Sequence, residues 1–573
     1  MTSGEIAVDL RSFQVAITGH RELEAERRPQ LTSQVRAVLG SVATAACSAV
    51  APAEPFLSLV TSLAEGADQL VAALALELGY TVHVVLPFTQ QDVRQDLAER
   101  GDDVEAFDDL LAQATSVVAL GGSLDDRPEA YARAGHVLQA HADLLVAVWD
   151  GEPARGRGGT ADIVAAARQR AVPVLVVPSR SDRGPALEGG PSLEVVVHRA
   201  LAPYARGAAD HDAKRAEGQQ ACLSALARET ARQGTWRWHL AAPFGQLWPW
   251  LAGSRRRTAS PPEPGPPLGL PASLGAACDE AGRLARHYAN LFRSAFLANF
   301  VLGTLAVGLA LAGVLVLVGQ LVEGSGAHGS TLGSAFAVAE LASLLVMIAI
   351  WRLGRRGRWH EKAVDYRTLA EQLRALRLGW PLGLAPPRPD ARAHTTPESD
   401  LSVHWTQHVV REVARRAGLP DVQMTDRYHR DVARALAGTV AEQGRYHRDV
   451  ATQYARLHHR LEHGALLFAL GALVPCVLHF LWHEPHITGW LLVLAAGLPA
   501  VAAALHGIDG QAELERLSKR SAAMAQWLDA IEAPSDDATW TELVAYTRSV
   551  VERMLDETND WQVLSRAGGL KAT

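Results

Sequence analysis

The chain has 573 residues and a formal net charge of −7 at neutral pH. A chain of this length exceeds one ordinary domain and predicts about three or four structural units. The negative charge gives no global signal for nucleic-acid binding, so we expect no nucleic-acid partner. Four scattered cysteines without metal-binding spacing argue against a disulfide framework and favour a reducing compartment: Cys47, Cys222, Cys278 and Cys476.

Residues 13–178 alternate short apolar runs with helical patterns. The runs are FQVAITG, FLSLVTSLA, TVHVVLPF, SVVAL, LLVAVWDG and VPVLVVP. Continuous runs of this kind are typical of parallel strands buried on both faces. We therefore predict an α/β, doubly wound, Rossmann-like domain over residues 1–180. In such domains ligands bind beyond the carboxyl ends of the strands.

Residues 181–272 are polar, with helical patches, and are predicted to form a helical or interfacial segment with a linker. Within them, Trp236 to Arg257 places four tryptophans ahead of three arginines. This pattern favours either a membrane-interface segment or packing against a neighbouring helix, and both remain open. Ser260 to Pro271 is rich in proline and predicts a stiff linker.

Four long apolar runs follow in two tight pairs: Phe296–Val318, Leu332–Trp351, Ala465–Trp482 and Gly489–Gly507. A helix needs about 20 apolar residues to cross a bilayer. We predict an all-α region with four transmembrane helices in two hairpins, and a lipid bilayer as partner. Buried core helices are the alternative. The predicted divisions are 273–385, a loop over 386–420, and 421–573, and a charged helical stretch after each hairpin suggests a diverged duplication.

Lysine and arginine placement predicts the orientation of these spans. The loops between the paired runs, Gly319 to Thr331 and His483 to Thr488, contain neither residue, whereas the outer flanks contain several arginines. Basic flanks stay in the cytoplasm. The N-terminal residues show no apolar signal-peptide core. We expect a multi-pass protein of the inner (cytoplasmic) membrane with both termini in the cytoplasm.

Polar residues follow the first two predicted strands, where a ligand would bind. The first strand ends in the sequence ITGHREL. Glycine permits close approach of the backbone to a ligand, and an arginine can hold a phosphate or carboxylate. The second ends in LAEGAD, whose acidic residues are candidates for ribose hydroxyls or simple helix caps. The candidate ligand-binding residues are Thr18, Gly19, His20, Arg21, Glu65, Gly66 and Asp68.

The fifth strand is followed by the glycine-rich sequence WDGEPARGRGGTADIV. Its glycines can expose backbone N–H groups to an anion, Thr160 is a candidate helix N-cap and hydroxyl donor, and the next helix directs its positive end at the loop. The sequence favours a phosphate site over a linker turn. The further candidates are Asp150, Gly151, Gly156, Gly158, Gly159 and Thr160.

Several histidines lie along one charged helical stretch before the third span: His429, His447, His458, His459 and His463. Their spacing favours a solvated or helix-packing face over a metal site, so we assign no metal.

The motifs ITGHR, LAEGAD, WDG and GxGGTA, in this order over residues 13–178, resemble the SLOG superfamily of DprA-like and lonely-guy-like Rossmannoid domains. Residues after each hairpin resemble the paired-helix SLATT membrane modules. The resemblance implies a nucleotide-ligand sensor joined to a membrane effector, as in prokaryotic defence or stress response. Lonely-guy hydrolases carry a catalytic glutamate where this chain has Ile163, so the resemblance assigns no catalytic residue, and enzymatic activity stays open.

Three functions are consistent with these features. A sensor would bind a nucleotide-derived small molecule, with no certain cofactor, and change the state of a self-associating membrane bundle. Glu340, inside the second span, is then a candidate for an oligomer or pore contact because a charge is costly in lipid. A membrane-anchored nucleotide hydrolase would use Glu65, Asp68 or Asp150. A non-catalytic membrane scaffold with a vestigial α/β domain is the third.

Overall fold

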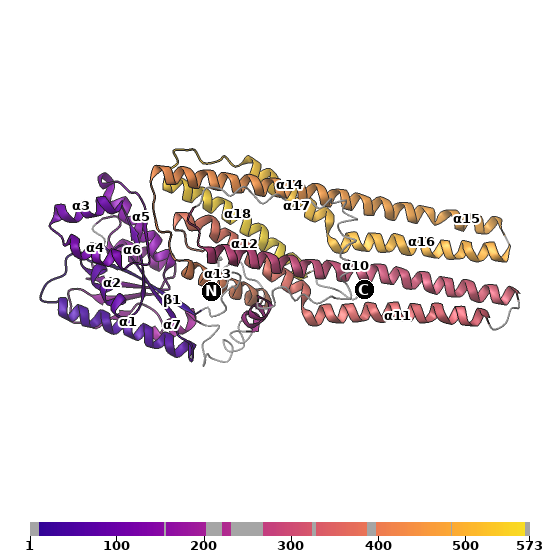
Figure 1. The fold of residues 1–573 in the computed structure, drawn as a ribbon, viewed down its shortest axis with the longest axis horizontal. Coiled ribbons are helices and arrows are strands. Elements are labelled where there is room, and N and C mark those ends of the chain that lie inside the picture. The colour runs from indigo at the N-terminus through magenta and orange to yellow at the C-terminus, as the bar shows by residue number, and fades with distance from the viewer. Residues whose placement is uncertain are drawn as a thin grey trace.

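The computed structural model describes residues 11–153, 156–201, 221–230, 244, 268–323, 328–386, 397–482 and 484–567. It has an α/β domain at one end and two long helical hairpins at the other, joined by a bundle of shorter helices (Figure 1). The predicted fold class is confirmed.

The α/β domain is built on one eight-stranded sheet with the order β7-β6-β5-β1-β2-β3-β4-β8, parallel except for β7. Each predicted apolar run forms one of its first six strands, because a run buried on both faces has no polar side to expose. The strands are β1 Ser12–Gly19, β2 Phe56–Thr61, β3 Thr81–Leu86, β4 Ser116–Ala119, β5 Leu144–Trp149, β6 Val174–Pro178, β7 Ala186–Leu187 and β8 Val422–Gln423.

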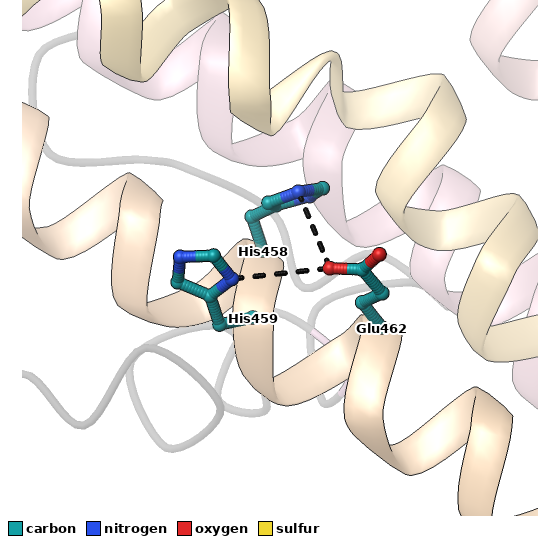
Figure 2. A group of neighbouring side chains, drawn as sticks. All are labelled: His458, His459 and Glu462. Atoms are coloured by element: carbon teal, nitrogen blue, oxygen red, sulfur yellow. Dashed lines mark ion pairs between the residues drawn. The ribbon is translucent and has the colours of Figure 1, made fainter.

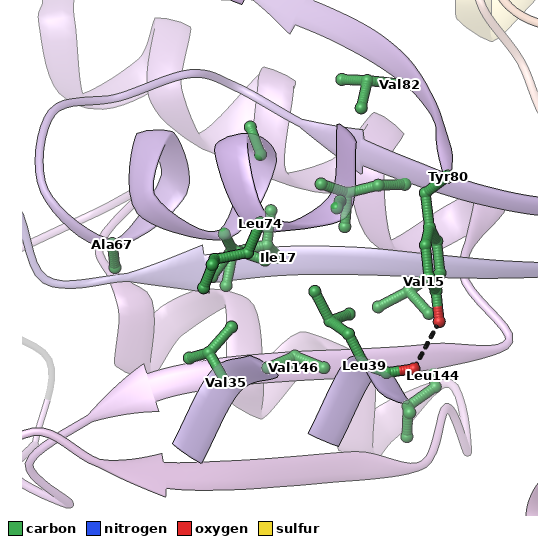
Figure 3. Close-up of a cluster of buried hydrophobic side chains, with 14 of the residues drawn as sticks. Val15, Ile17, Val35, Leu39, Ala67, Leu74, Tyr80, Val82, Leu144 and Val146 are labelled. Atoms are coloured by element: carbon green, nitrogen blue, oxygen red, sulfur yellow. Dashed lines mark hydrogen bonds between the residues drawn. The ribbon is translucent and has the colours of Figure 1, made fainter. Parts of the chain in front are cut away.

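Helices cover both faces of the sheet. On one face, Val15 and Ile17 of β1 pack in the same core as Val35 and Leu39 of the first helix, and the hydroxyl of Tyr80 donates to the Leu39 carbonyl at 2.8 Å (Figure 3). The helices of this domain are α1 Arg28–Val50, α2 Ala67–Glu77, α3 Gln90–Arg100, α4 Val104–Ala112, α5 Arg127–His141, α6 Thr160–Gln169 and α7 Leu193–Ala200, with the short 3-10 helix η1 Leu124–Asp126.

The remaining helices form the bundle and the hairpins (Figure 1). They are α10 Ala272–Glu323, α11 His328–Gly357, α12 Trp359–Gly379, η3 Trp380–Leu382, α13 Pro397–Ala417, α14 Asp426–Gly471, α15 Leu473–Leu481, α16 Pro485–Ala512, α17 Leu514–Ala530 and α18 Trp540–Ala567. Helix α10 of one hairpin packs against α16 of the other.

Four helical segments are long and apolar enough to cross a membrane: Ala272–Gly319, Thr331–Gly357, Asp426–Leu481 and Ile487–Ala530. Their large apolar side chains face outward. Leu467 is 71 % exposed and Phe480 is 80 % exposed. Apolar surface of this extent requires an apolar environment. The chain is therefore a multi-pass membrane protein.

The two hairpins share one construction. Helix α11 ends at Gly357 and α16 ends at Ala512. The next residue in each case, Arg358 or Glu513, adopts the left-handed conformation, with φ of +50° and +48°. After each bend the next helix packs back on the long first helix of its own hairpin, α12 on α10 and α17 on α14. We call α10–α12 the first module and α14–α17 the second module.

The bundle docks on the second face of the sheet through a shared hydrophobic core. This core contains Val60 and Val85 of the sheet together with Leu436 of α14 and Leu543 of α18. Strand β8, which immediately precedes α14, pairs in parallel with β4. The membrane-proximal helices and the sheet therefore form one continuous packed unit.

A buried polar cluster makes a second junction at the amino ends of β1 and β5. The backbone N–H of Ser12 donates to Glu412 of α13 at 2.9 Å, and Arg415 of α13 pairs with Asp143, next to β5. Asp143 also accepts from the N–H of Gln14 at 3.0 Å. Glu412 and Arg415 are both buried, so α13 is fixed to the base of the two central strands.

The structure differs from the predicted divisions in two places. The α/β domain extends past residue 180, because β7 and α7 belong to it. The segment 386–420, predicted as a loop, contains helix α13 from Pro397 to Ala417. The polar residues of that stretch form the buried pairs with the sheet, and this tertiary partner was not visible in the sequence. Most of the tryptophan-rich segment and of the proline-rich linker lies outside the described residues.

Candidate ligand-binding cleft

A cleft lies at the carboxyl ends of β1 and β5. These strands are neighbours in the sheet, but the chain proceeds from β1 through β2, β3 and β4 on one side before crossing to β5 on the other. Such a switch point is where ligands bind in open α/β sheets. The cleft has a volume of about 390 Å³, within the roughly 300–1,000 Å³ of small-molecule sites.

Most of the sequence-predicted ligand residues line this cleft. Those that do are Thr18, Gly19, His20, Arg21, Asp68, Asp150, Gly156, Gly158, Gly159 and Thr160. Three others do not: Glu65 borders a smaller adjoining hollow, Gly66 packs against backbone, and Gly151 sits on an exposed turn with a φ of +86°.

The glycines at the first two strand ends are needed for packing. A Cβ on Gly19 would lie 2.4 Å from the Cβ of Ala67, where β1 meets the start of α2. Gly66 has a φ of +83°, and a Cβ there would lie 1.9 Å from the carbonyl oxygen of Arg21. The two glycines therefore let helix α2 approach the end of β1 closely, which forms one wall of the cleft.

A carboxylate and a histidine connect the first and fifth strand ends. His20 Nε2 lies 3.0 Å from Asp150 Oδ1, and Arg180 lies 3.3 Å from Oδ2. Burial alone would raise the pKa of Asp150. The N–H of Glu152, the His20 ring and the Arg180 charge outweigh burial and lower the pKa. Asp150 is therefore ionised and organises the loop after β5.

Asp68, in the first turn of α2, is the opposite case. Its side chain is buried, and burial raises its pKa to about 6, although Ser62 donates a hydrogen bond of 2.6 Å to Oδ2. A carboxyl group with this pKa exchanges a proton near neutral pH. It is the one residue on the described cleft lining with a carboxyl pKa raised this far.

The glycine-rich loop places its backbone close to α5. Gly158 has a φ of +77°, and a Cβ there would lie 2.6 Å from the backbone N of Ala132. The N–H of Gly158 donates to Asp162 Oδ2 at 2.9 Å, so this donor is engaged within the loop. Thr160 was predicted as the N-cap of α6, but Gly159 occupies that position and Thr160 is the first helical residue. Its side chain still lines the cleft.

Ile163 also lines the cleft. It is 9 % exposed and contacts α5, where Gly135 has no side chain to displace it: a Cβ on Gly135 would lie 2.7 Å from Ile163 Cδ1. An aliphatic side chain can neither accept a proton nor stabilise a developing positive charge. Ile163 therefore supplies no acid or base to this part of the cleft.

Arginines from helices α3 and α5 surround the cleft, and sequence reasoning missed them. Arg100 and Arg127 both bind the buried carboxylate of Asp96 at 2.9 Å, and this shared partner holds both at the rim. Arg21 stacks over the ring of Tyr131 with 4.4 Å to the centroid. These cations make an anionic ligand favourable. In sequence they are ordinary charged residues of polar helices, and only the packing of α3 against α5 brings them here.

Glu65 lies beside the cleft and has an unusual ionisation. Burial, reinforced by a hydrogen bond and charge repulsion from Asp102, raises its pKa to about 7. It borders the hollow that also contains Arg21, Arg100 and Tyr131. Glu65 therefore shares this hollow with Arg21 and Arg100.

Glu340 lies on α11, far from this cleft, and is partly exposed along the second candidate span. Within the described part of the chain, no contact joins it to the cleft.

Among the described residues, one group has the ligand atoms to hold a metal ion: His458, His459 and Glu462 on α14 (Figure 2). Glu462 lies 3.7 Å from His458 and 3.8 Å from His459. His458 Nδ1 also hydrogen-bonds Asp509 of α16 at 2.9 Å. His459 and Glu462 are well exposed, and the contacts are accounted for by ion pairs on a helix surface that join α14 to α16.

Comparison with protein-family models, with curated proteins and with solved structures finds no match to this chain.

Proposed function

We propose that this protein is a membrane-anchored sensor of a phosphate-bearing, nucleotide-derived ligand, whose α/β domain controls the state of the transmembrane helices. The observation that carries the proposal is the cleft itself. It lies at the switch point of a doubly wound sheet and is lined by arginines and a glycine-rich loop. Ile163 lines it where the resemblance to lonely-guy hydrolases would place a catalytic glutamate. Such a site binds an anion without cutting it by the family mechanism.

The proposal includes the family assignment and the setting. The α/β domain would be a SLOG-type sensor and the hairpins SLATT-type modules, in the inner membrane with both termini in the cytoplasm. Self-association would accompany the effector step, with Glu340 as a contact between copies. A role in prokaryotic defence or stress response follows from the same resemblance.

The junctions between sheet and bundle supply a route for control. A ligand in the cleft contacts the carboxyl ends of β1 and β5, while Ser12 and Asp143 at their amino ends hold α13. The opposite face of the sheet shares a core with α14 and α18. A ligand shifts the bundle only through a difference in affinity for two of its states. Because β1 and β5 would contact the ligand at one end and hold α13 at the other, a ligand that favours one arrangement of these strands can favour one state of the bundle.

The test uses the full chain in liposomes and a panel of nucleoside monophosphates, dinucleotides and cyclic nucleotides. We expect at least one to bind, and to change the leakage of an entrapped dye. Thr160→Val removes a hydroxyl that would donate to phosphate, so affinity should fall roughly ten- to a hundredfold, as for a hydrogen bond to a charged group. Thr32→Val, on the exposed face of α1, is the matched control. The proposal is refuted if dye leakage is the same with and without every ligand of the panel and is unchanged by Thr160→Val.

A second candidate function rests on Asp68. A buried carboxyl group with a pKa of about 6 in a cleft has the ionisation of a general acid or base, so a nucleotide hydrolase is the alternative. Product formation from the same panel decides it. If nucleotide turnover is abolished by Asp68→Asn and retained in Glu65→Gln, the protein is a hydrolase and the sensor proposal is wrong.

A further inference from the structure

A second cavity lies between the two modules, on the α/β-domain side of the apolar spans. Its volume is about 440 Å³, and α10, α12, α14, α17 and α18 all contribute to its lining. Its lining includes Phe296, the first residue of the apolar run of α10. We call it the intermodule cavity. It shares no residue with the ligand-binding cleft.

The cavity is lined by two pairs of arginines. Arg286 and Arg293 lie seven residues apart on α10, and Arg367 and Arg374 lie seven residues apart on α12. Residues at this spacing share one face of a helix. Two antiparallel-packed helices thus direct a row of guanidinium groups into the same space, which suits the oxygens of a phosphate group.

The carboxylates of the cavity have arginine partners. Glu371 pairs with Arg374 at 2.5 Å, and Glu557 pairs with Arg520 at 3.1 Å. Glu513 lies 3.6 Å from Arg516. Because these carboxylates are paired and arginines outnumber them, the cavity has an excess of positive charge.

The rest of the lining is apolar or aromatic. Phe292 packs against the ring of His360 with 4.4 Å between centroids and against Phe296 with 5.8 Å. Tyr446 and Tyr454 of α14 face the same space. A ligand that fits this lining carries both a phosphate and an apolar part, and the neighbouring apolar spans place the cavity at the surface of a bilayer.

We propose that the intermodule cavity binds the phosphate headgroup of an anionic lipid from the leaflet on the α/β-domain side. Basic pockets between membrane helices bind lipid phosphates in this way. The bound headgroup bridges α10 and α12 of the first module to α14 and α17 of the second. Glu513, the left-handed residue at the bend between α16 and α17, is part of the lining. Occupancy of the cavity therefore fixes the spacing of the two modules.

The experiment measures lipid retained by the full chain, by native mass spectrometry, after extraction from vesicles. One set of vesicles is pure phosphatidylcholine and the other also contains phosphatidylglycerol. We expect retained phosphatidylglycerol with the wild type, and a loss of roughly tenfold or more in affinity with Arg286→Gln/Arg367→Gln, since each removes a charge-assisted contact. Arg456→Gln, an exposed arginine of α14 outside the lining, is the control and should match the wild type.

Addition of inorganic phosphate separates two sources of the same chemistry. Phosphate that displaces phosphatidylglycerol, with the same dependence on Arg286 and Arg367, would identify a soluble phosphate as a second occupant of the proposed site. Equal lipid retention by the double variant and the wild type overturns the proposal, as does an equal loss with Arg456→Gln. If the double variant does not fold, lipid retention is measured with Arg286→Gln alone, because this side chain is exposed and its substitution should leave the fold intact.

Discussion

Asp68→Asn gives the sharpest physical test of the cleft. The carboxyl group has a pKa of about 6 in the folded chain against 3.8 for an ordinary aspartate, because burial disfavours its charge. Between pH 3.8 and about 6 the unfolded chain has released this proton while the folded chain retains it. The free energy of unfolding therefore falls by about 1.4 kcal/mol per pH unit over this range. The total reaches about 3 kcal/mol by pH 7.

The neutral side chain introduced by Asp68→Asn has nothing to titrate and keeps an oxygen that can accept from Ser62. We therefore expect the variant to lose this pH dependence and to be more stable than the wild type above pH 6, with the difference vanishing toward pH 4. The free energy of unfolding at each pH is measured by urea unfolding of the full chain in neutral detergent, with proteolysis of the α/β domain as the signal. Asp109→Asn, exposed on α4, is the control. Equal pH dependence of Asp68→Asn and the wild type would show that Asp68 is not buried as described.

Two further predictions concern the loop and the junction. Gly158→Ala should destabilise the α/β domain by about 2–4 kcal/mol, from its left-handed φ and the close backbone of Ala132, and weaken ligand binding. Gly40→Ala, on α1 outside the cleft and with open space around it, should do neither. A thermal shift and a binding titration measure both effects. Arg415→Met removes the arginine paired with the buried Glu412 and leaves Asp143 with only the more distant Arg411, at 3.6 Å, so it should cost about 3–5 kcal/mol. Arg434→Met, which removes an exposed ion pair with Asp536, should lower the free energy of unfolding by less than about 1 kcal/mol. Equal losses of stability in the Arg415 and Arg434 variants would contradict a buried junction.

The sequence was most informative where burial leaves a continuous pattern. The six longer strands appear as apolar runs, and the spans appear as long apolar runs in which Glu340 is the single charged residue, because each environment tolerates few polar side chains. Strands β7 and β8 have two residues each, too few to leave any period. Strand β8 also lies far along the chain from its partner β4, so local reasoning had no means of adding it to the sheet.

The cleft was predictable only in part, for a related reason. Strand ends and glycines occupy fixed places in the doubly wound topology, so Thr18, Arg21 and Gly158 could be assigned from their position. Arg100 and Arg127 line the cleft only because both bind Asp96, and that contact depends on how α3 packs against α5. The glycines were also predicted to contact a ligand, but Gly19, Gly66 and Gly158 serve close packing, and the N–H of Gly158 is engaged by Asp162.

Helices of the membrane bundle cover part of the sheet, and this limits how the α/β domain can move. A doubly wound sheet needs apolar cover on both faces, and here α14 and α18 supply part of that cover beside α5 and α6. Helix α14 continues without a break into the third candidate span. Separation of the domain from the bundle would expose the shared core, so the two cannot move as independent bodies without a large cost. A ligand that changes the spacing of β1 and β5 must therefore act on α13 and α14 as well, and through α14 on the membrane hairpin.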